Sequence, residues 1–229
     1  MKKTTIVAIL LLFSSTAFSS SIITEINTIE SEWAQIYYAQ NDLVQKEAYL
    51  KLIDKTNKLI EKHPKSVELA IWKAILISTN AEFENPFSAL ESIRIAKNLL
   101  ESSIIKQPKA LDGAAFVVLG TLYYMTPSWP ISFGNQNKAE QLLKKGLEIN
   151  PNSIDANYFY ANYLLSKNKI KKASKYFKLA LNTPVRSTQK YADKQLKNEA
   201  LIALKNTEQR ILESGKNKFL SLFSTAQKE

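Results

Sequence analysis

The sequence predicts an all-α protein built from consecutive helical hairpins. The 229 residues include only five glycines and seven prolines, so few positions interrupt long helices. A pattern of small and large apolar residues also recurs in three segments, with a spacing that places them on one face of a helix. Because the chain has no cysteine but is 45% apolar, its fold must depend on packed helices rather than on disulfides.

The recurring pattern starts at Ala96, Ala139 and Ala173. In each segment a larger apolar residue follows four positions later, a small residue seven positions later, and a proline soon after. The members after the first alanine are Leu100, Ser103, Ile104 and Pro108; Leu143, Gly146, Leu147 and Pro151; and Phe177, Ala180, Leu181 and Pro184. The small residues allow a neighbouring helix to come close, and the proline ends one helix and suits the first turn of the next.

These patterns predict four helical hairpins followed by one longer helix. The expected helices cover residues 23–40, 44–63, 66–80, 87–106, 110–125, 137–149, 153–167, 170–182 and 187–213. In the last one, Leu196, Ala200, Leu204 and Ile211 form an apolar stripe. Because a terminal hairpin has no neighbour on its outer face, we expect this helix to cover it as a cap.

The stretch NPNSIDANYFYANYLLSKNKIKKASKYFKLALNTP resembles a tetratricopeptide repeat (TPR). The distance of 34 residues from Ala139 to Ala173 equals the repeat length of that family. The resemblance rests on Ala161, Ala173, Phe177, Ala180 and Pro184, whereas Asn157 and Asn168 replace residues that are usually Trp and Gly. It implies a right-handed α-solenoid of about four degenerate hairpins over residues 20–214, with a long C-terminal capping helix. It also implies an inner groove that includes Asp155, Tyr158 and Asn162 in the last repeat.

The two ends of the chain are expected to lie outside this array. Lys2 and Lys3 precede an apolar run from Ile6 to Phe13 and then small residues, which is typical of a secretory signal peptide over residues 1–19. We therefore expect a periplasmic or secreted protein, with no membrane span after cleavage. Residues 215–229 are expected to form a flexible basic tail.

The net charge of +10, or +8 without Lys2 and Lys3, suggests an anionic partner. Export argues against nucleic acid. Lys171, Lys175 and Lys178 share one side of a predicted helix, which suits either a solvated face or an acidic partner.

Catalysis is not expected. The only histidine, His63, precedes Pro64 at a helix end, and no nucleophile motif accompanies it. A single histidine without cysteine does not supply a usual zinc site. Gly113, Gly120 and Gly134 are too scattered to form a phosphate-binding loop. The sequence therefore predicts a non-enzymatic protein without a metal or another cofactor.

The loop TPSWPISFGNQ, residues 126–136, is the first candidate binding site. Its prolines reduce the entropy lost on binding, and Trp129 and Phe133 either anchor a partner or fill a gap between helices. Tyr124 precedes the loop. The second candidate is the inner groove with Asp155, Tyr158 and Asn162.

Two functions fit these candidates. The first is a scaffold that binds an envelope protein or a peptide segment. The second is a carrier of a small or apolar ligand beside a substrate-binding protein. For this second function, SFGNQNKAE and KAEQLLKKGLEINP resemble the T component of TRAP-type transport systems. A carrier should have an enclosed apolar pocket lined by Tyr124, Trp129 or Phe133, whereas a scaffold should have an open groove.

Overall fold

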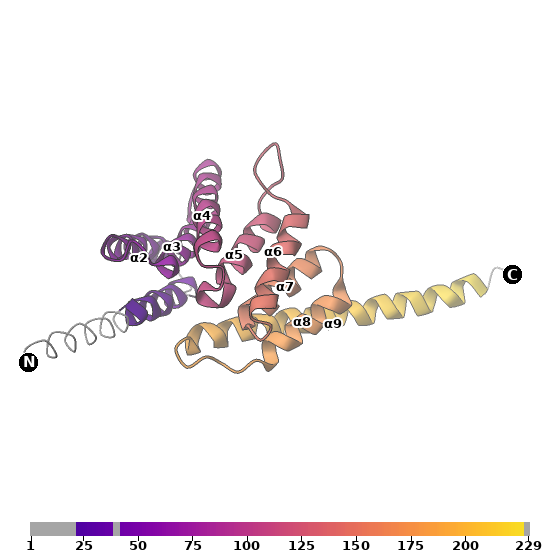
Figure 1. The fold of residues 1–229 in the computed structure, drawn as a ribbon. Helices are drawn as coiled ribbons and strands as arrows, with labels where there is room; N and C mark the ends of the chain where they lie inside the picture. Colours follow the sequence, from indigo (N-terminus) through magenta and orange to yellow (C-terminus); the bar gives the residue numbers. More distant parts are fainter. Residues whose placement is uncertain (1–21, 39–41, 227–229) are drawn as a thin grey trace, which may run out of the picture.

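The computed structural model describes residues 22–38 and 42–226 and shows an all-α fold (Figure 1). Within these residues the only β pairing is one isolated bridge between Ser128 and Gly134. The predicted fold class is thus confirmed at the level of helix content. The predicted signal peptide, residues 1–19, lies outside the described residues. None of the helices in the described part has the length and apolar character needed to cross a bilayer.

The helix boundaries agree closely with those predicted. A first helix covers residues 22–37. It is followed by α2 (Asp42–Lys62), α3 (Val67–Asn80), η1 (Ala81–Phe83), α4 (Pro86–Lys106), η2 (Ala110–Gly113), α5 (Ala114–Met125), α6 (Gln136–Ile149), α7 (Ile154–Ser166), α8 (Ile170–Asn182) and α9 (Lys190–Ala226).

Side-chain caps explain where four of these helices begin. Ser66, Asn85, Asn135 and Ser153 each accept a hydrogen bond from a backbone N–H of the first turn of α3, α4, α6 and α7, respectively. Such caps satisfy N–H groups that have no partner inside the helix. Pro86 then occupies the first turn of α4, where its missing N–H costs nothing.

Consecutive helices pack in pairs: α3 with α4, α5 with α6, and α7 with α8, while α9 packs on α8 and α7. Ala96, Ala139 and Ala173 are fully buried, as the pattern of small residues predicts. One close contact lies at Gly120 in α5, where an added Cβ would lie 2.8 Å from Leu143 Cγ and 3.2 Å from the Ala139 carbonyl oxygen. Glycine therefore allows α5 and α6 to touch through backbone atoms.

The core extends through the described helices. One cluster surrounds the first helix, α2 and α3, and includes Ile29, Tyr49 and Trp72. A larger cluster runs from α3 to α9. Ile75 and Leu111 pack against both clusters, so the two form one continuous interior.

Two local turns depart from regular helix. Leu111, Asp112 and Gly113 have φ values of 46°, 54° and 81° and form a left-handed turn before α5. This turn delays the start of α5 to Ala114. Asn168, between α7 and α8, has a φ of 54°. Asparagine is one of the few residues that adopts this conformation readily.

The last helix is longer than predicted. We expected it to end at residue 213, but α9 continues to Ala226, and most of the predicted tail therefore has helical backbone. Figure 1 shows the C-terminal part of α9 extending past α8, away from the other helices. The sequence misled here because Gly215 is a common helix end, although an isolated glycine inside a helix costs only about 1 kcal/mol relative to alanine.

Candidate binding surface

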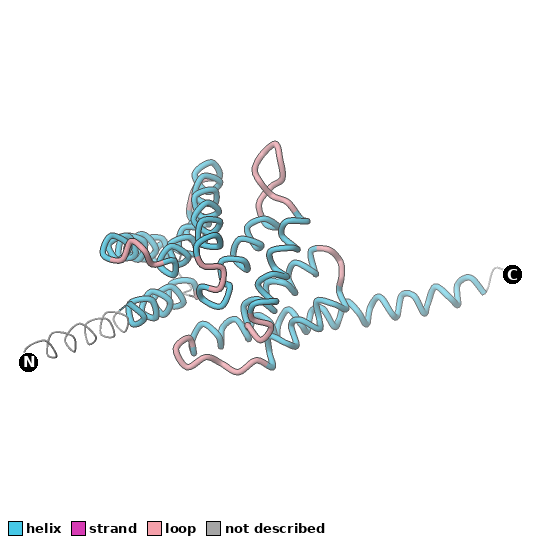
Figure 2. Tube along the Cα trace, viewed as in Figure 1, coloured by secondary structure: helices cyan, strands magenta, loops and turns pink. Residues whose placement is uncertain are grey.

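The loop between α5 and α6 projects beyond the ends of both helices (Figure 2). Its base is closed by backbone hydrogen bonds: Gly134 N–H donates to Pro127 O at 2.9 Å, and Asn135 N–H donates to Tyr123 O at 2.9 Å. At Gly134 an added Cβ would lie only 2.0 Å from the Thr126 carbonyl oxygen. The loop can therefore close in this form only with glycine at this position.

The two aromatic side chains of the loop have different environments. Phe133 packs edge-on against Tyr123, with ring centroids 5.2 Å apart, and contacts the main core. The ammonium of Lys97 lies 5.7 Å from the centroid of the Phe133 ring. Trp129, in contrast, is 86% exposed. Of the two roles expected for these residues, Phe133 thus fills a gap, and Trp129 remains available for a partner.

An open groove of about 630 Å³ separates this loop from α4. Its two walls are lined by Phe87, Leu90, Glu91, Arg94, Lys97 and Asn98 of α4 and by Trp129, Pro130, Ile131, Ser132 and Phe133 of the loop. The α4 residues recur every three or four positions along one side of the helix and span about 16 Å. Phe87 is 88% exposed and Ile131 is 69% exposed, so large apolar groups stand on both sides of the groove.

The charged side chains of the groove are already paired. Arg94 donates to both oxygens of the Glu91 carboxylate, one turn away on α4. Lys97 donates to Glu101 at 2.8 Å, and Glu101 also accepts a hydrogen bond from the Tyr123 hydroxyl. These pairs leave the groove close to neutral in a strongly basic chain, and apolar contact is its main means of binding.

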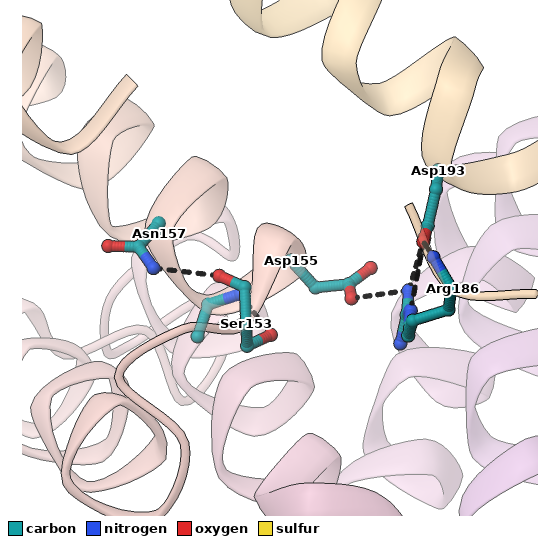
Figure 3. A network of polar contacts seen from close by, with 6 residues as sticks. Ser153, Asp155, Asn157, Arg186 and Asp193 are labelled. Atoms are coloured by element: carbon teal, nitrogen blue, oxygen red, sulfur yellow. Dashed lines mark hydrogen bonds and ion pairs between the residues drawn. The ribbon is translucent and has the colours of Figure 1, made fainter. Parts of the chain in front are cut away.

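The predicted inner-groove residues lie elsewhere, on one side of α7. Asp155 accepts a hydrogen bond from Arg186 at 2.9 Å (Figure 3). The Tyr158 hydroxyl donates to Glu199 of α9 at 2.8 Å, and the Asn162 side chain donates to the Tyr158 carbonyl oxygen. Two of these three residues therefore contact the C-terminal part of the same chain.

Tyr124 does not line the groove. It packs edge-on against Tyr163, with ring centroids 6.0 Å apart, and burial raises the pKa of its hydroxyl. Of the six predicted site residues, Trp129 and Phe133 thus line the groove beside α4. The other four do not line this groove and contact other parts of the chain.

Sequence reasoning missed Phe87 and Ile131. A usable indication existed for Phe87: it precedes Ala96 by nine residues, which at 100° per residue places it on the opposite side of α4 from the buried face. A large aromatic residue on that side of a helix points away from the core. For Ile131 the sequence offers no comparable indication, because its exposure depends on the shape of the loop.

We expect Gly134→Ala to open the base of the loop. The new methyl group would collide with backbone atoms that cannot rotate away, so the closed loop should be destabilised by about 1–3 kcal/mol. Limited proteolysis with chymotrypsin should show faster cleavage after Phe133 than in the unmodified protein. Ser132→Ala, in the same loop, should leave the cleavage rate unchanged; equal rates for both variants would contradict the role given to Gly134.

No protein-family model matches the sequence, and no curated protein has significant similarity to it. Among the described residues, no three side chains of His, Cys, Asp or Glu are grouped so that they could hold a metal ion. Any functional argument therefore depends on the groove and on the packing of the helices.

Proposed function

We propose that this protein is a non-catalytic TPR-type scaffold of the cell envelope, which binds a protein partner in the groove between α4 and the loop of residues 126–135. The proposed array has four hairpins: the first helix with α2, α3 with α4, α5 with α6, and α7 with α8. The hairpins would form a right-handed superhelix with α9 as its cap. The pairwise packing and the buried small residues at the helix contacts support this arrangement.

The observation that carries the proposal is the exposure of three large apolar side chains around one groove. Phe87, Trp129 and Ile131 are 88%, 86% and 69% exposed. Covering such groups on binding yields about 25 cal/mol for each Å² removed from water. Tryptophan is also among the residues that most often dominate the energy of protein interfaces. A neighbouring protein segment could insert apolar side chains between these two walls.

The open shape of the groove favours a protein partner over a small apolar ligand. Small-molecule sites usually enclose most of the ligand surface. This groove is open to solvent, and Tyr124, expected in a ligand pocket, is not among its lining residues. The role of a ligand carrier similar to a TRAP T component remains the alternative, with less support from this geometry.

The periplasmic location is part of the same proposal and rests on residues 1–19. The basic net charge suits the anionic surroundings of an envelope protein. Fractionation of cells that express the full chain should place the processed protein in the periplasm; a full-length product in the cytosol would contradict export.

We expect Trp129→Ala to weaken partner binding by at least 10-fold, because loss of an interface hot spot costs about 2 kcal/mol or more. The melting temperature should stay the same, since Trp129 supports little of the core. The measurement is quantitative capture of native envelope proteins on the immobilised chain, followed by titration of the purified partner.

Met125→Ala is the matched control for this experiment. Met125 is 68% exposed and precedes the same loop, but it does not line the groove. This variant should bind as the unmodified protein does. Undiminished capture by Trp129→Ala, or an equal loss in both variants, would contradict the proposed function.

A further inference from the structure

The first helix packs against the helices that follow it, and the residue after it contacts the start of α9. Its apolar face, with Ile26, Ile29 and Trp33, packs against α2 and α3. Tyr38, directly after this helix, meets Tyr191 of α9 edge-on, with ring centroids 6.2 Å apart. The end of the first helix thus lies next to the start of α9.

Glu30 lies about two turns before Tyr38 on the first helix and is only 7% exposed. The charged groups that act on it come from three parts of the chain: Arg186 from the segment between α8 and α9, Asp155 from α7, and Asp193 from α9. Gln189, also before α9, is a further polar side chain that acts on Glu30. The carboxyl group of Glu30 therefore connects the first helix to the last hairpin and its cap.

The cation at this contact is already shared by two other carboxylates. Arg186 forms ion pairs with Asp193, which is 1% exposed, and with Asp155 at 2.9 Å (Figure 3). Among the described residues, Glu30 itself forms no ion pair. Glu30 is thus a third carboxyl group that interacts with one guanidinium, and a third ionised carboxylate in this buried place is unfavourable.

Protonation of Glu30 relieves this excess of negative charge. Burial, the largest cause, raises the pKa of Glu30 from 4.5 to about 7. Arg186 and Gln189 oppose the shift, and Asp155 and Asp193 add to it. Two other contacts hold the same helix to α2 without involving Glu30: Lys55 with Glu32 at 2.6 Å, and His63 with Glu25 at 3.3 Å.

We propose that this contact is a proton-dependent clasp, which holds the first helix against α7 and α9 most tightly when Glu30 carries a proton. The clasp is separate from the groove at α4. Its loosening would uncover the side of α7 with Asp155 and Tyr158 and so offer a second binding surface.

The direction of the pH effect follows from the two protonation states. In the released helix Glu30 has its ordinary pKa of 4.5, and in the closed clasp its pKa is about 7. The contribution of Glu30 to closure is therefore complete below pH 4.5 and is lost as the pH rises through 7. Between pH 5.5 and pH 8.0 the closure constant should fall by about 30-fold.

Hydrogen exchange of the full exported chain tests this clasp. Protection factors for residues 22–37, corrected for intrinsic exchange rates, should fall by about 30-fold from pH 5.5 to pH 8.0. Amides of α5 and α6 should keep their protection and thus show that the opening is local. In Glu30→Gln, whose side chain has a similar shape but no charge, protection of the first helix should not depend on pH.

Three results would overturn the proposal: pH-independent protection in the unmodified chain, the same fall in Glu30→Gln, or loss of the fall in His63→Gln. The last variant is needed because His63 contacts Glu25 of the same helix. If Glu30→Gln does not fold, a carbon-13 NMR titration of the Glu30 carboxyl in the unmodified chain decides the question. A midpoint near pH 7 supports the clasp, and a midpoint near pH 4.5 contradicts it.

Discussion

Replacing Gly120 with leucine is expected to lower the free energy of unfolding by about 3 kcal/mol, the upper part of the range for overpacked sites. At this position the backbone of α5 rests on the Leu143 side chain and on the backbone of α6. A Cβ would already come within 3.1 Å of the Leu143 amide nitrogen and 3.2 Å of the Ala139 carbonyl oxygen. Because both atoms belong to the backbone of α6, rotation of a side chain cannot relieve the collision, and the two helices must separate.

The matched control is Lys145→Leu, an exposed position of α6. It introduces the same side chain near the same pair of helices and should change stability by less than about 0.5 kcal/mol. Urea unfolding followed by circular dichroism measures both variants. Similar stability for Gly120→Leu and Lys145→Leu would show that close contact at small residues does not hold these helices together.

The second large effect is expected for Arg186→Met. The change leaves the Asp193 carboxylate, which is 1% exposed, without the guanidinium that pairs with it. Removing one partner of a fully buried ion pair costs about 3–5 kcal/mol. Since the Arg186 side chain is 40% exposed, solvent reduces this effect, and we expect about 2 kcal/mol.

Arg210→Met provides the comparison for this prediction. Arg210 is exposed on α9, and its nearest polar contact is a long one of 3.5 Å to Asn168. Its replacement should change stability by less than about 0.5 kcal/mol in the same urea experiment. If Arg186→Met is as stable as Arg210→Met, the network in Figure 3 does not stabilise the segment before α9, which contradicts this prediction.

Most helix boundaries could be predicted from the sequence because they depend on local chemistry. Capping by Ser153 and the proline at residue 151 define the start of α7 within a few residues of the chain. Ala139 and Ala173 identify buried faces because helical periodicity fixes which residues lie together. The end of α9 could not be predicted in this way, since Gly215 marks a helix end in many sequences and yet lies inside this helix.

The binding surfaces were less predictable because they depend on how distant segments meet. The sequence could not distinguish Trp129 from Phe133, since the inward position of Phe133 depends on Tyr123 and Lys97. Nor could it indicate that Glu30 meets the segment before α9. That contact joins segments that lie far apart in the sequence and leaves no local pattern.

Photo-crosslinking in intact cells tests the proposed groove most directly. A photoreactive phenylalanine analogue is placed at residue 87 on α4, at residue 131 in the loop, or at residue 105, which in the unmodified protein is an isoleucine with 84% exposure. Position 105 lies on the same side of α4 as Phe87 but about 27 Å along the helix. We expect positions 87 and 131 to label the same envelope protein and position 105 to label none. The same labelling at all three positions, or different proteins at 87 and 131, would contradict a single binding groove between α4 and the loop.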